Sequence, residues 1–216
     1  MRRLYYVKNR TMVGKIMSSN INKAREIFKN NNGILRSSEA QKLGINPITI
    51  ARMLENGLIS KEARGLYRLS DSDIEGDPNL INVAKLVPRA VVCLISALSF
   101  HEMTTQIPRK VYIALPREYK SPSIEYPPIE IFYLSDKPYK AGIEEHEIGG
   151  ISVAIYNRAK TVTDCFKFRS KIGEDVATEA LKDYLRDENR SIEQLLHYAA
   201  INRVKKRMEP YIKALI

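Results

Sequence analysis

The sequence predicts an α+β protein of two domains. The first is a small module of helices with a β-hairpin, and the second is a mixed α/β domain that ends in a helical bundle. Three observations predict this organisation. The 216 residues exceed one typical domain, a loop-like segment follows residue 70, and the two parts that this segment separates differ in charge. Apolar residues make up 44% of the chain, which is enough for a core and excludes wholesale disorder.

The boundary between the parts is the segment SDSDIEGDPN at residues 70–79. It is acidic, contains Gly76 and Pro78, and lacks apolar periodicity, which is typical of a linker. The predicted organisation is a basic extension over residues 1–18, a first domain over 19–70, a linker over 71–78 and a second domain over 79–216.

The net charge of +10 lies entirely in the N-terminal third of the chain. Residues 1–70 contain 14 Lys and Arg against 4 Asp and Glu, whereas residues 71–216 contain 21 of each sign. Without the first 18 residues the balance is still 9 against 4. A basic module joined to a neutral one favours a first domain that binds a polyanion and is attached to a separate second domain.

Composition excludes several other classes of protein. Cys93 and Cys165 are too few for a disulfide framework and form no zinc motif, which fits a reducing cytoplasm. The longest mainly apolar run has 11 residues, at 90–100, and includes Ser96 and Ser99, whereas a membrane span needs roughly 20. The basic start lacks the continuous apolar stretch of a secretory signal. We therefore expect a cytoplasmic protein with no membrane segment.

The first domain begins with an amphipathic helix. Ile21, Ala24, Ile27 and Phe28 follow the spacing of one buried helix face. This spacing predicts a helix over residues 19–31.

Two further helices follow a short extended piece. Ser38 with Gln41 three residues later is a capping-box pattern that predicts the start of the second helix, and Gly44 ends it. Asn46-Pro47 predicts the start of the third, because asparagine caps helices well and proline suits the first helical position. The third helix is expected to end near Asn56.

A hairpin completes the first domain. Residues 58–61 and 66–69 are expected to pair as strands around a tight turn. Helix, short strand, helix, turn, helix and two-stranded wing is the order of a winged helix-turn-helix. The third helix of such a module lies in the major groove of DNA, so residues 19–70 are predicted to bind DNA. The alternative is that the three helices mediate protein contacts only.

The outer face of the third helix supplies the candidate base contacts. Arg52 is the first choice, because its planar guanidinium suits guanine O6 and N7. Ile48 can touch a thymine methyl group, and Thr49 and Asn46 can donate to a phosphate or a base edge. Thr49 has the alternative role of stabilising the first turn of its helix.

Phosphate contacts are expected from basic residues around this helix. Such contacts position the protein and carry the salt dependence of binding without reading the sequence. The candidates are Lys61, Arg64 and Arg68 on or beside the wing, and Arg36 and Lys42 near the two ends of the second helix.

The second domain mixes helix and strand patterns. Gly149-Gly150 is a strong hairpin-turn signal between two of the strands. The expected strands are 111–115, 129–134, 142–148 and 151–156, and the expected helices are 80–86, 91–102, 159–170, 173–187, 191–201 and 203–215.

Three stretches of the chain resemble the abortive-infection AbiEi-type antitoxins, the regulators of type IV toxin–antitoxin pairs. They are LVPRAVVCLISALSFHEMTTQIPRKVYIALP, IEEHEIGGISVAIYNRAKTVTDCFKF and the wing segment GLYRLSD. The resemblance extends over about residues 19–216. It implies a role in phage defence, with a winged helix that binds inverted repeats in its own promoter and represses the operon.

The resemblance also implies the role of the second domain. That domain is expected to act as the antitoxin against a nucleotidyltransferase-like toxin encoded beside it, with direct contact between the two proteins left open. An inverted repeat requires two copies of the chain, which is expected to be monomeric when free or to pair on DNA. No cofactor, metal or enzymatic activity is implied.

Basic residues of the second domain form a possible secondary surface. This surface is either a solvated helix face or a site that contacts the DNA backbone, an acidic toxin or RNA. The residues are Arg158, Lys160, Arg203, Lys205, Lys206 and Arg207, with Lys167, Arg169 and Lys171 on the same helix as Lys160.

Catalytic and metal-binding interpretations have weaker support. The run Glu144–Glu147 with His146 supplies at most half a metal site on one strand face, and a solvated strand edge is the better explanation. Lys110 with Glu130 does not match the spacing of a nuclease motif. His101, His197 and Cys165 have no partner pattern that would activate a nucleophile. The remaining alternative is an interaction module that acts on a toxin without binding DNA.

Overall fold

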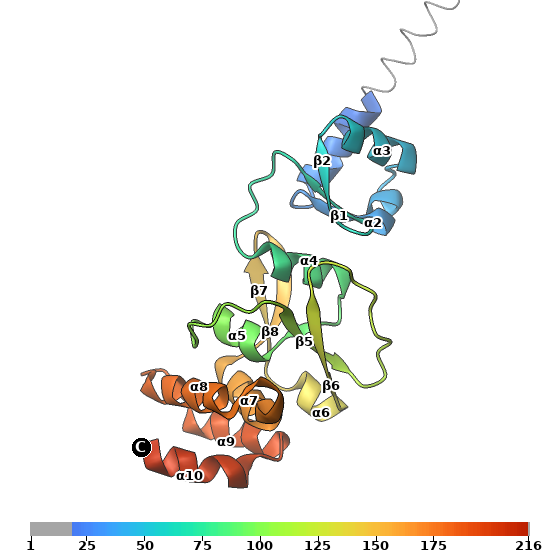
Figure 1. Ribbon diagram of the computed structural model, residues 1–216. Helices are drawn as coiled ribbons and strands as arrows, with labels where there is room; N and C mark the ends of the chain where they lie inside the picture. Colours follow the sequence, from blue (N-terminus) through green and yellow to red (C-terminus); the bar gives the residue numbers. More distant parts are fainter. Residues whose placement is uncertain (1–18, 216) are drawn as a thin grey trace, which may run out of the picture. The chain divides into compact units, whose positions relative to one another are not determined.

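The computed structural model describes residues 19–215, which fold into two compact units that divide between Gly76 and Asp77. Figure 1 shows both units. The basic extension expected over residues 1–18 lies outside the described residues.

The N-terminal unit contains three helices and a small antiparallel sheet with the strand order β1-β3-β2. Its elements are a helix over residues 19–29, β1 (Ile34–Arg36), α2 (Ser37–Lys42), α3 (Pro47–Glu55), β2 (Ile59–Ala63) and β3 (Leu66–Leu69). This arrangement has the element order of the winged helix-turn-helix that the sequence predicts.

A single apolar cluster joins these elements. Phe28 of the first helix, Ala40 of α2 and Met53 of α3 are fully covered by their neighbours. Full burial of a Phe or Met side chain contributes about 1.5–3 kcal/mol, so the cluster fixes the angle at which the helices cross.

The start of α2 differs from the prediction by one residue. The helix begins at Ser37 rather than Ser38, and the residue three positions into it is Glu39. The carboxylate of Glu39 accepts a 2.9 Å hydrogen bond from the backbone N–H of Arg36. A carboxylate is a stronger acceptor than the amide of Gln41, so the capping interaction forms around Glu39.

The C-terminal unit is built on a five-stranded mixed sheet with the order β6-β5-β4-β8-β7. The strands are β4 (Val91–Val92), β5 (Val111–Pro116), β6 (Ile129–Leu134), β7 (Ile143–Ile148) and β8 (Ile151–Tyr156). The helices are α4 (Pro78–Leu86), α5 (Leu94–Phe100), α6 (Asp136–Lys140), α7 (Arg158–Ile172), α8 (Glu174–Arg186), α9 (Ile192–Ile201) and α10 (Lys205–Leu215).

Two elements of this unit differ from the sequence prediction. Val91–Val92 forms the central strand, where a single helix over 91–102 was expected, and only Leu94–Phe100 is helical. Val92 pairs with Ile113 on one side and Ile155 on the other. A short apolar run fits a buried strand as well as a helix, so only the neighbouring strands settle its structure. The short helix α6 was not predicted.

The four last helices form the predicted bundle, and Figure 1 shows them together at one end of the C-terminal unit. Val162 and Cys165 of α7 are fully buried against Leu181 of α8, Leu195 of α9 and Met208 of α10. No helix within residues 19–215 is both long enough and apolar enough to cross a membrane.

Candidate nucleic-acid interface

A tight corner joins α2 to α3. The backbone N–H of Gly44 donates to the carbonyl of Gln41 (3.0 Å), and that of Ile45 donates to the carbonyl of Ala40 (2.9 Å). Gly44 has a φ of +87°, which L side chains rarely adopt. Ile45 then turns into the core. The glycine therefore allows the chain to reverse between the two helices of the helix-turn-helix.

Asn46 fixes the start of α3. Its Oδ1 atom accepts hydrogen bonds from the backbone N–H of Thr49 (2.8 Å) and from the hydroxyl of Thr49 (3.0 Å). Thr49 is only 7% exposed. Its hydroxyl therefore belongs to the helix cap, as in the alternative role expected from the sequence, while the rest of the exposed Asn46 side chain faces solvent.

The two faces of α3 differ in character. Ile50 and Met53 lie in the core. Ile48 is 64% exposed, an unusual position for a large apolar side chain. Arg52 is half-buried and forms no ion pair with any residue in the described part of the chain. Ile48 and Arg52 are four residues apart, which places them on the same face of the helix. The apolar side chain of Ile48 and the guanidinium of Arg52, which has no acidic partner among the described residues, thus share the outer face of α3.

The wing is anchored next to the helix-turn-helix. Gly65, at the turn between β2 and β3, has a φ of +74°. Its carbonyl accepts a 2.8 Å hydrogen bond from the backbone N–H of Ser37, the first residue of α2. Lys61 on β2 and Arg64 at the turn are exposed. Two free cations therefore project from a wing whose turn is bonded to α2.

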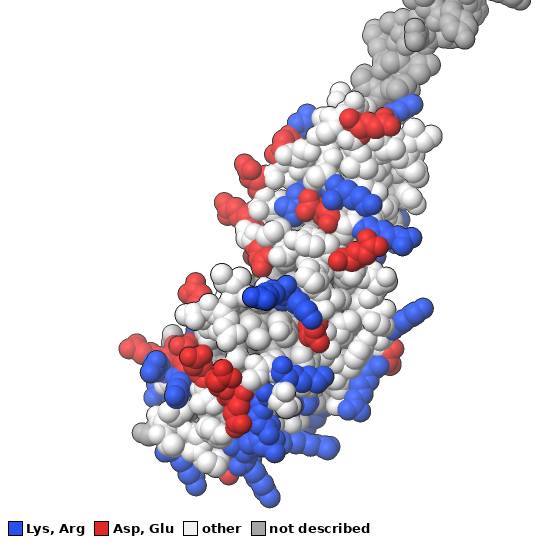
Figure 2. Space-filling model, in the orientation of Figure 1, with Lys and Arg blue, Asp and Glu red and all other residues white. Residues whose placement is uncertain are grey.

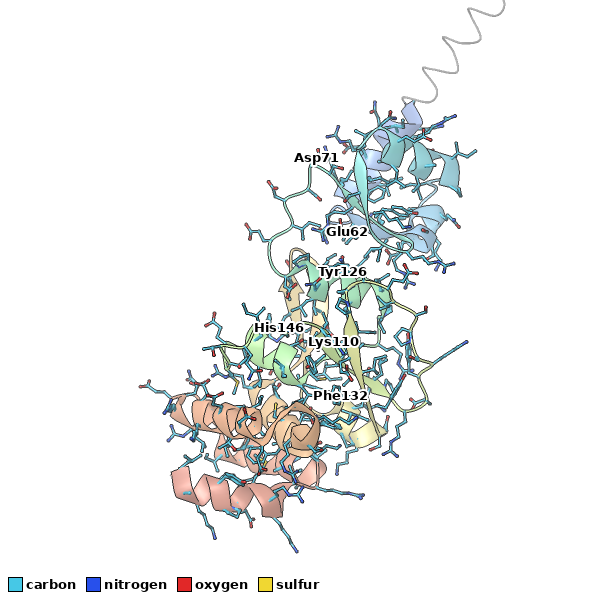
Figure 3. The ribbon with its side chains drawn as sticks, viewed as in Figure 1. Glu62, Asp71, Lys110, Tyr126, Phe132 and His146 are labelled. Carbon is cyan, nitrogen blue, oxygen red and sulfur yellow. The ribbon has the colours of Figure 1, made fainter. Side chains whose placement is uncertain are left out.

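Arg68 does not offer a free cation to a phosphate. Its side chain is 16% exposed, and its Nη2 atom lies 3.6 Å from a carboxylate oxygen of Glu62 (Figure 3 labels Glu62). This pair links β3 to β2 within the wing. Arg68 was expected to contact a phosphate, and its burial corrects that expectation. Arg36, at the N-terminus of α2, is half-buried, and Lys42, the last residue of α2, is exposed.

One basic residue of the first helix is also neutralised. Arg25 donates to the carboxylate of Asp71, which lies just after β3 (Figure 3). This hydrogen bond holds the pKa of Asp71 below its usual value. The cations left without an acidic partner in residues 19–76 therefore include Lys42, Arg52, Lys61 and Arg64, all of them in or beside α3 and the wing.

The secondary basic surface of the C-terminal unit needs a correction at Lys160. Lys160 is completely buried, and its Nζ atom lies 2.6 Å from both carboxylate oxygens of Asp164. It therefore contributes to the core and not to the surface. Arg158 is held in an ion pair with Asp187 (3.1 Å). The expected surface residues that are exposed are Arg203, Lys205, Lys206 and Arg207.

The catalytic alternatives gain no support from the geometry. No three His, Cys, Asp or Glu side chains within residues 19–215 are grouped as metal ligands. Lys110 and Glu130 form an exposed 2.9 Å ion pair, which raises the pKa of Lys110 and is typical of a surface contact. Burial raises the pKa of both Cys93 and Cys165, which disfavours the reactive thiolate.

Comparison with solved structures supports the fold. The crystal structure of the RV2827C protein from Mycobacterium tuberculosis matches with a TM-score of 0.55 and 11% sequence identity, covering 92% of this chain and 81% of that chain. A likeness at this identity shows the fold alone. Among curated proteins, none matches this sequence.

Comparison with family models bears on the N-terminal unit. Residues 22–70 match the model of a family described as "Transcriptional regulator, AbiEi antitoxin". The match spans α2, α3 and the wing, and it confirms the resemblance seen in the sequence over these residues. Residues 22–70 of this chain are thus similar to the AbiEi antitoxin family of transcriptional regulators.

Proposed function

We propose that this protein binds promoter DNA through its N-terminal unit, represses its own operon and acts as the antitoxin of a type IV toxin–antitoxin pair. Helix α3 enters the major groove, with Arg52 reading guanine and Ile48 contacting a thymine methyl group. Asn46, at the start of α3, would face the DNA backbone at the edge of the groove, while the buried Thr49 keeps its role in the helix cap. Lys42, Lys61 and Arg64 contact phosphates on either side, and Arg36 adds charge beside them.

One observation carries this proposal, namely that the exposed Ile48 and the half-buried, unpaired Arg52 share the outer face of α3. A large apolar side chain that is 64% exposed adds little to the core, and the guanidinium beside it forms no ion pair with a described residue. Both groups match chemistry found on base edges in the major groove. The wing places further unpaired cations beside the same helix, as phosphate contact requires.

The family match supports the regulator and antitoxin roles. The finer assignment concerns the C-terminal unit, which we propose counters a nucleotidyltransferase-like toxin encoded in the same operon. Operator binding and antitoxin action would both take place in the cytoplasm, where the promoter lies. Two copies of the chain would occupy an inverted repeat, each with one α3 in a major groove. No catalytic step or cofactor is part of the proposal.

A footprint on the DNA upstream of the gene tests the regulatory half. We expect protection of an inverted repeat by the full chain, and loss of a reporter signal from the same promoter when the chain is expressed. A protein that leaves this DNA unprotected at low ionic strength would instead be an interaction module. Rescue of growth by the chain when the neighbouring gene is induced tests the antitoxin half.

A further inference from the structure

A basic pocket in the C-terminal unit is not accounted for by operator binding. It has a volume of about 700 Å³, within the range of small-molecule sites. Four Lys and Arg residues line it, and its lining contains no Asp or Glu. The cations are Arg117, Lys137, Lys167 and Arg203, and the polar residues Ser135, His197 and Asn202 lie among them.

The pocket lies where two parallel strands of the sheet, β5 and β6, end. β5 and β6 are parallel, so their carboxyl ends meet at one edge of the sheet. Arg117 directly follows β5, and its backbone N–H donates to the carbonyl of Leu134 at the end of β6 (3.0 Å). Ser135 directly follows β6, and its side chain makes no capping hydrogen bond to α6. Ligands commonly bind outside the carboxyl ends of parallel strands.

The pocket cations are free of acidic partners. Arg117, Lys137, Lys167 and Arg203 form no ion pair with any residue between 19 and 215. Nearby carboxylates are already engaged, since Asp136 pairs with Lys140 and Asp164 pairs with Lys160. Figure 2 shows Lys and Arg side chains over the end of the C-terminal unit where α6 to α10 lie, beside a stripe of Asp and Glu side chains.

The positive charges lie close enough to oppose one another. Burial lowers the pKa of Lys167, and the charges of Lys160, Arg117 and Arg203 lower it further, while Asp164 acts in the opposite direction. An anion in the pocket would relieve this repulsion. Asn202 adds a second feature, because it is 4% exposed and its Oδ1 atom has no hydrogen-bond partner among the described residues.

We infer that this pocket binds a small compound that carries a chain of two or three phosphates. Several cations around one cavity match a ligand with several linked negative charges, since a single phosphate can contact only some of them. The volume leaves room for an organic group beside the phosphates. An inorganic polyphosphate and a nucleoside triphosphate share this chemistry, and the experiment distinguishes them.

Isothermal titration of the full chain with sodium tripolyphosphate, ATP and adenosine tests the inference. We expect saturable 1:1 binding of tripolyphosphate and of ATP, and no binding of adenosine. Tighter binding of ATP would support an organic group in the cavity, and equal binding would support recognition of the phosphate chain alone. The double variant Arg117→Gln/Lys137→Gln removes two exposed pocket cations, and we expect affinity to fall about tenfold or more.

The matched control is Lys205→Gln/Lys206→Gln, which removes two exposed cations outside the pocket lining. We expect its affinity to fall clearly less than that of the pocket variant, because neither side chain lines the cavity. Equal weakening in both double variants would overturn the inference, as would the absence of saturable binding. Loss of non-operator duplex binding in the pocket variant, without polyphosphate binding by the unmodified chain, would instead assign the cluster to the DNA backbone.

Discussion

Lys160 and Asp164 form an ion pair inside the C-terminal unit, with Nζ 2.6 Å from both carboxylate oxygens and side-chain exposures of 0% and 1%. Asn202 donates a further 2.8 Å hydrogen bond to the same carboxylate. The Lys160 ammonium also lies 4.1 Å from the centre of the Tyr156 ring. A charge pair in this position is held by several partners at once, so each member depends on the other.

The first prediction concerns this pair. Asp164→Asn or Lys160→Met leaves one buried charge unpaired, and we expect each to lower the free energy of unfolding by about 3–5 kcal/mol. The double variant Lys160→Met/Asp164→Leu should lose less than the sum of the two. Urea unfolding followed by circular dichroism measures these changes. Single variants as stable as the unmodified chain would show that the two charges are solvated in solution.

The second prediction concerns base recognition by α3. Arg52→Ala removes the proposed guanine contact, so operator affinity should fall by about 1–3 kcal/mol and the preference at that base should relax. Binding titrations on the operator and on duplexes with single base changes measure this. Lys23→Ala is a matched control, because Lys23 is an exposed cation on the first helix, outside α3 and the wing. An unchanged operator preference in the Arg52 variant would remove this residue from the reading face.

The third prediction concerns the wing. Arg64→Ala should weaken binding to all DNA sequences alike and reduce the salt slope by about one, because one phosphate contact is lost. The measurement is the affinity for operator and scrambled duplexes over a range of salt concentrations. A selective loss on the operator alone would mean that Arg64 reads a base.

The fourth prediction concerns pH. The Nε2 atom of His101 lies 2.8 Å from the carbonyl of Tyr156, and burial lowers the pKa of this ring below its usual 6.5. The unfolded chain therefore binds the proton more readily than the folded chain does. Stability from the neutral ring is present above pH 6.5 and is lost as the pH falls through the lower folded value.

Thermal unfolding of the full chain between neutral and mildly acidic pH measures this effect. We expect the melting temperature of the C-terminal unit to fall on acidification. His101→Gln should show a smaller fall, since it removes the titrating group. If the melting temperature of the variant fell on acidification as much as that of the unmodified chain, His101 would be excluded as the origin of the effect.

Local sequence signals predicted much of the N-terminal unit. Asn46-Pro47 marked the start of α3, because a cap and a proline at the first position act within a few residues. The helical spacing of Ile50 and Met53 likewise gave the outer face on which Ile48 and Arg52 lie. These features depend on short-range chemistry, which the sequence displays directly.

Features that depend on distant neighbours were not predictable in the same way. Val91–Val92 was assigned to a helix because its strand character comes from partners on β5 and β8. Lys160 and Asp164 are spaced as a helical ion pair, but only the packing of the unit decides that this pair is buried. The basic pocket likewise combines Arg117, Lys137 and Lys167, which are separated in sequence and meet only in the fold.

The central claim is that α3 presents its Ile48 and Arg52 face to the major groove of operator DNA. Fluorescence anisotropy of labelled upstream DNA, titrated with the full chain and with the Ile48→Asp/Arg52→Ala variant, tests it most directly. We predict tight, salt-dependent binding with preference for the operator over a scrambled duplex, and loss of that preference in the variant. Equal affinity for both duplexes, or the same preference with and without these two side chains, would contradict it.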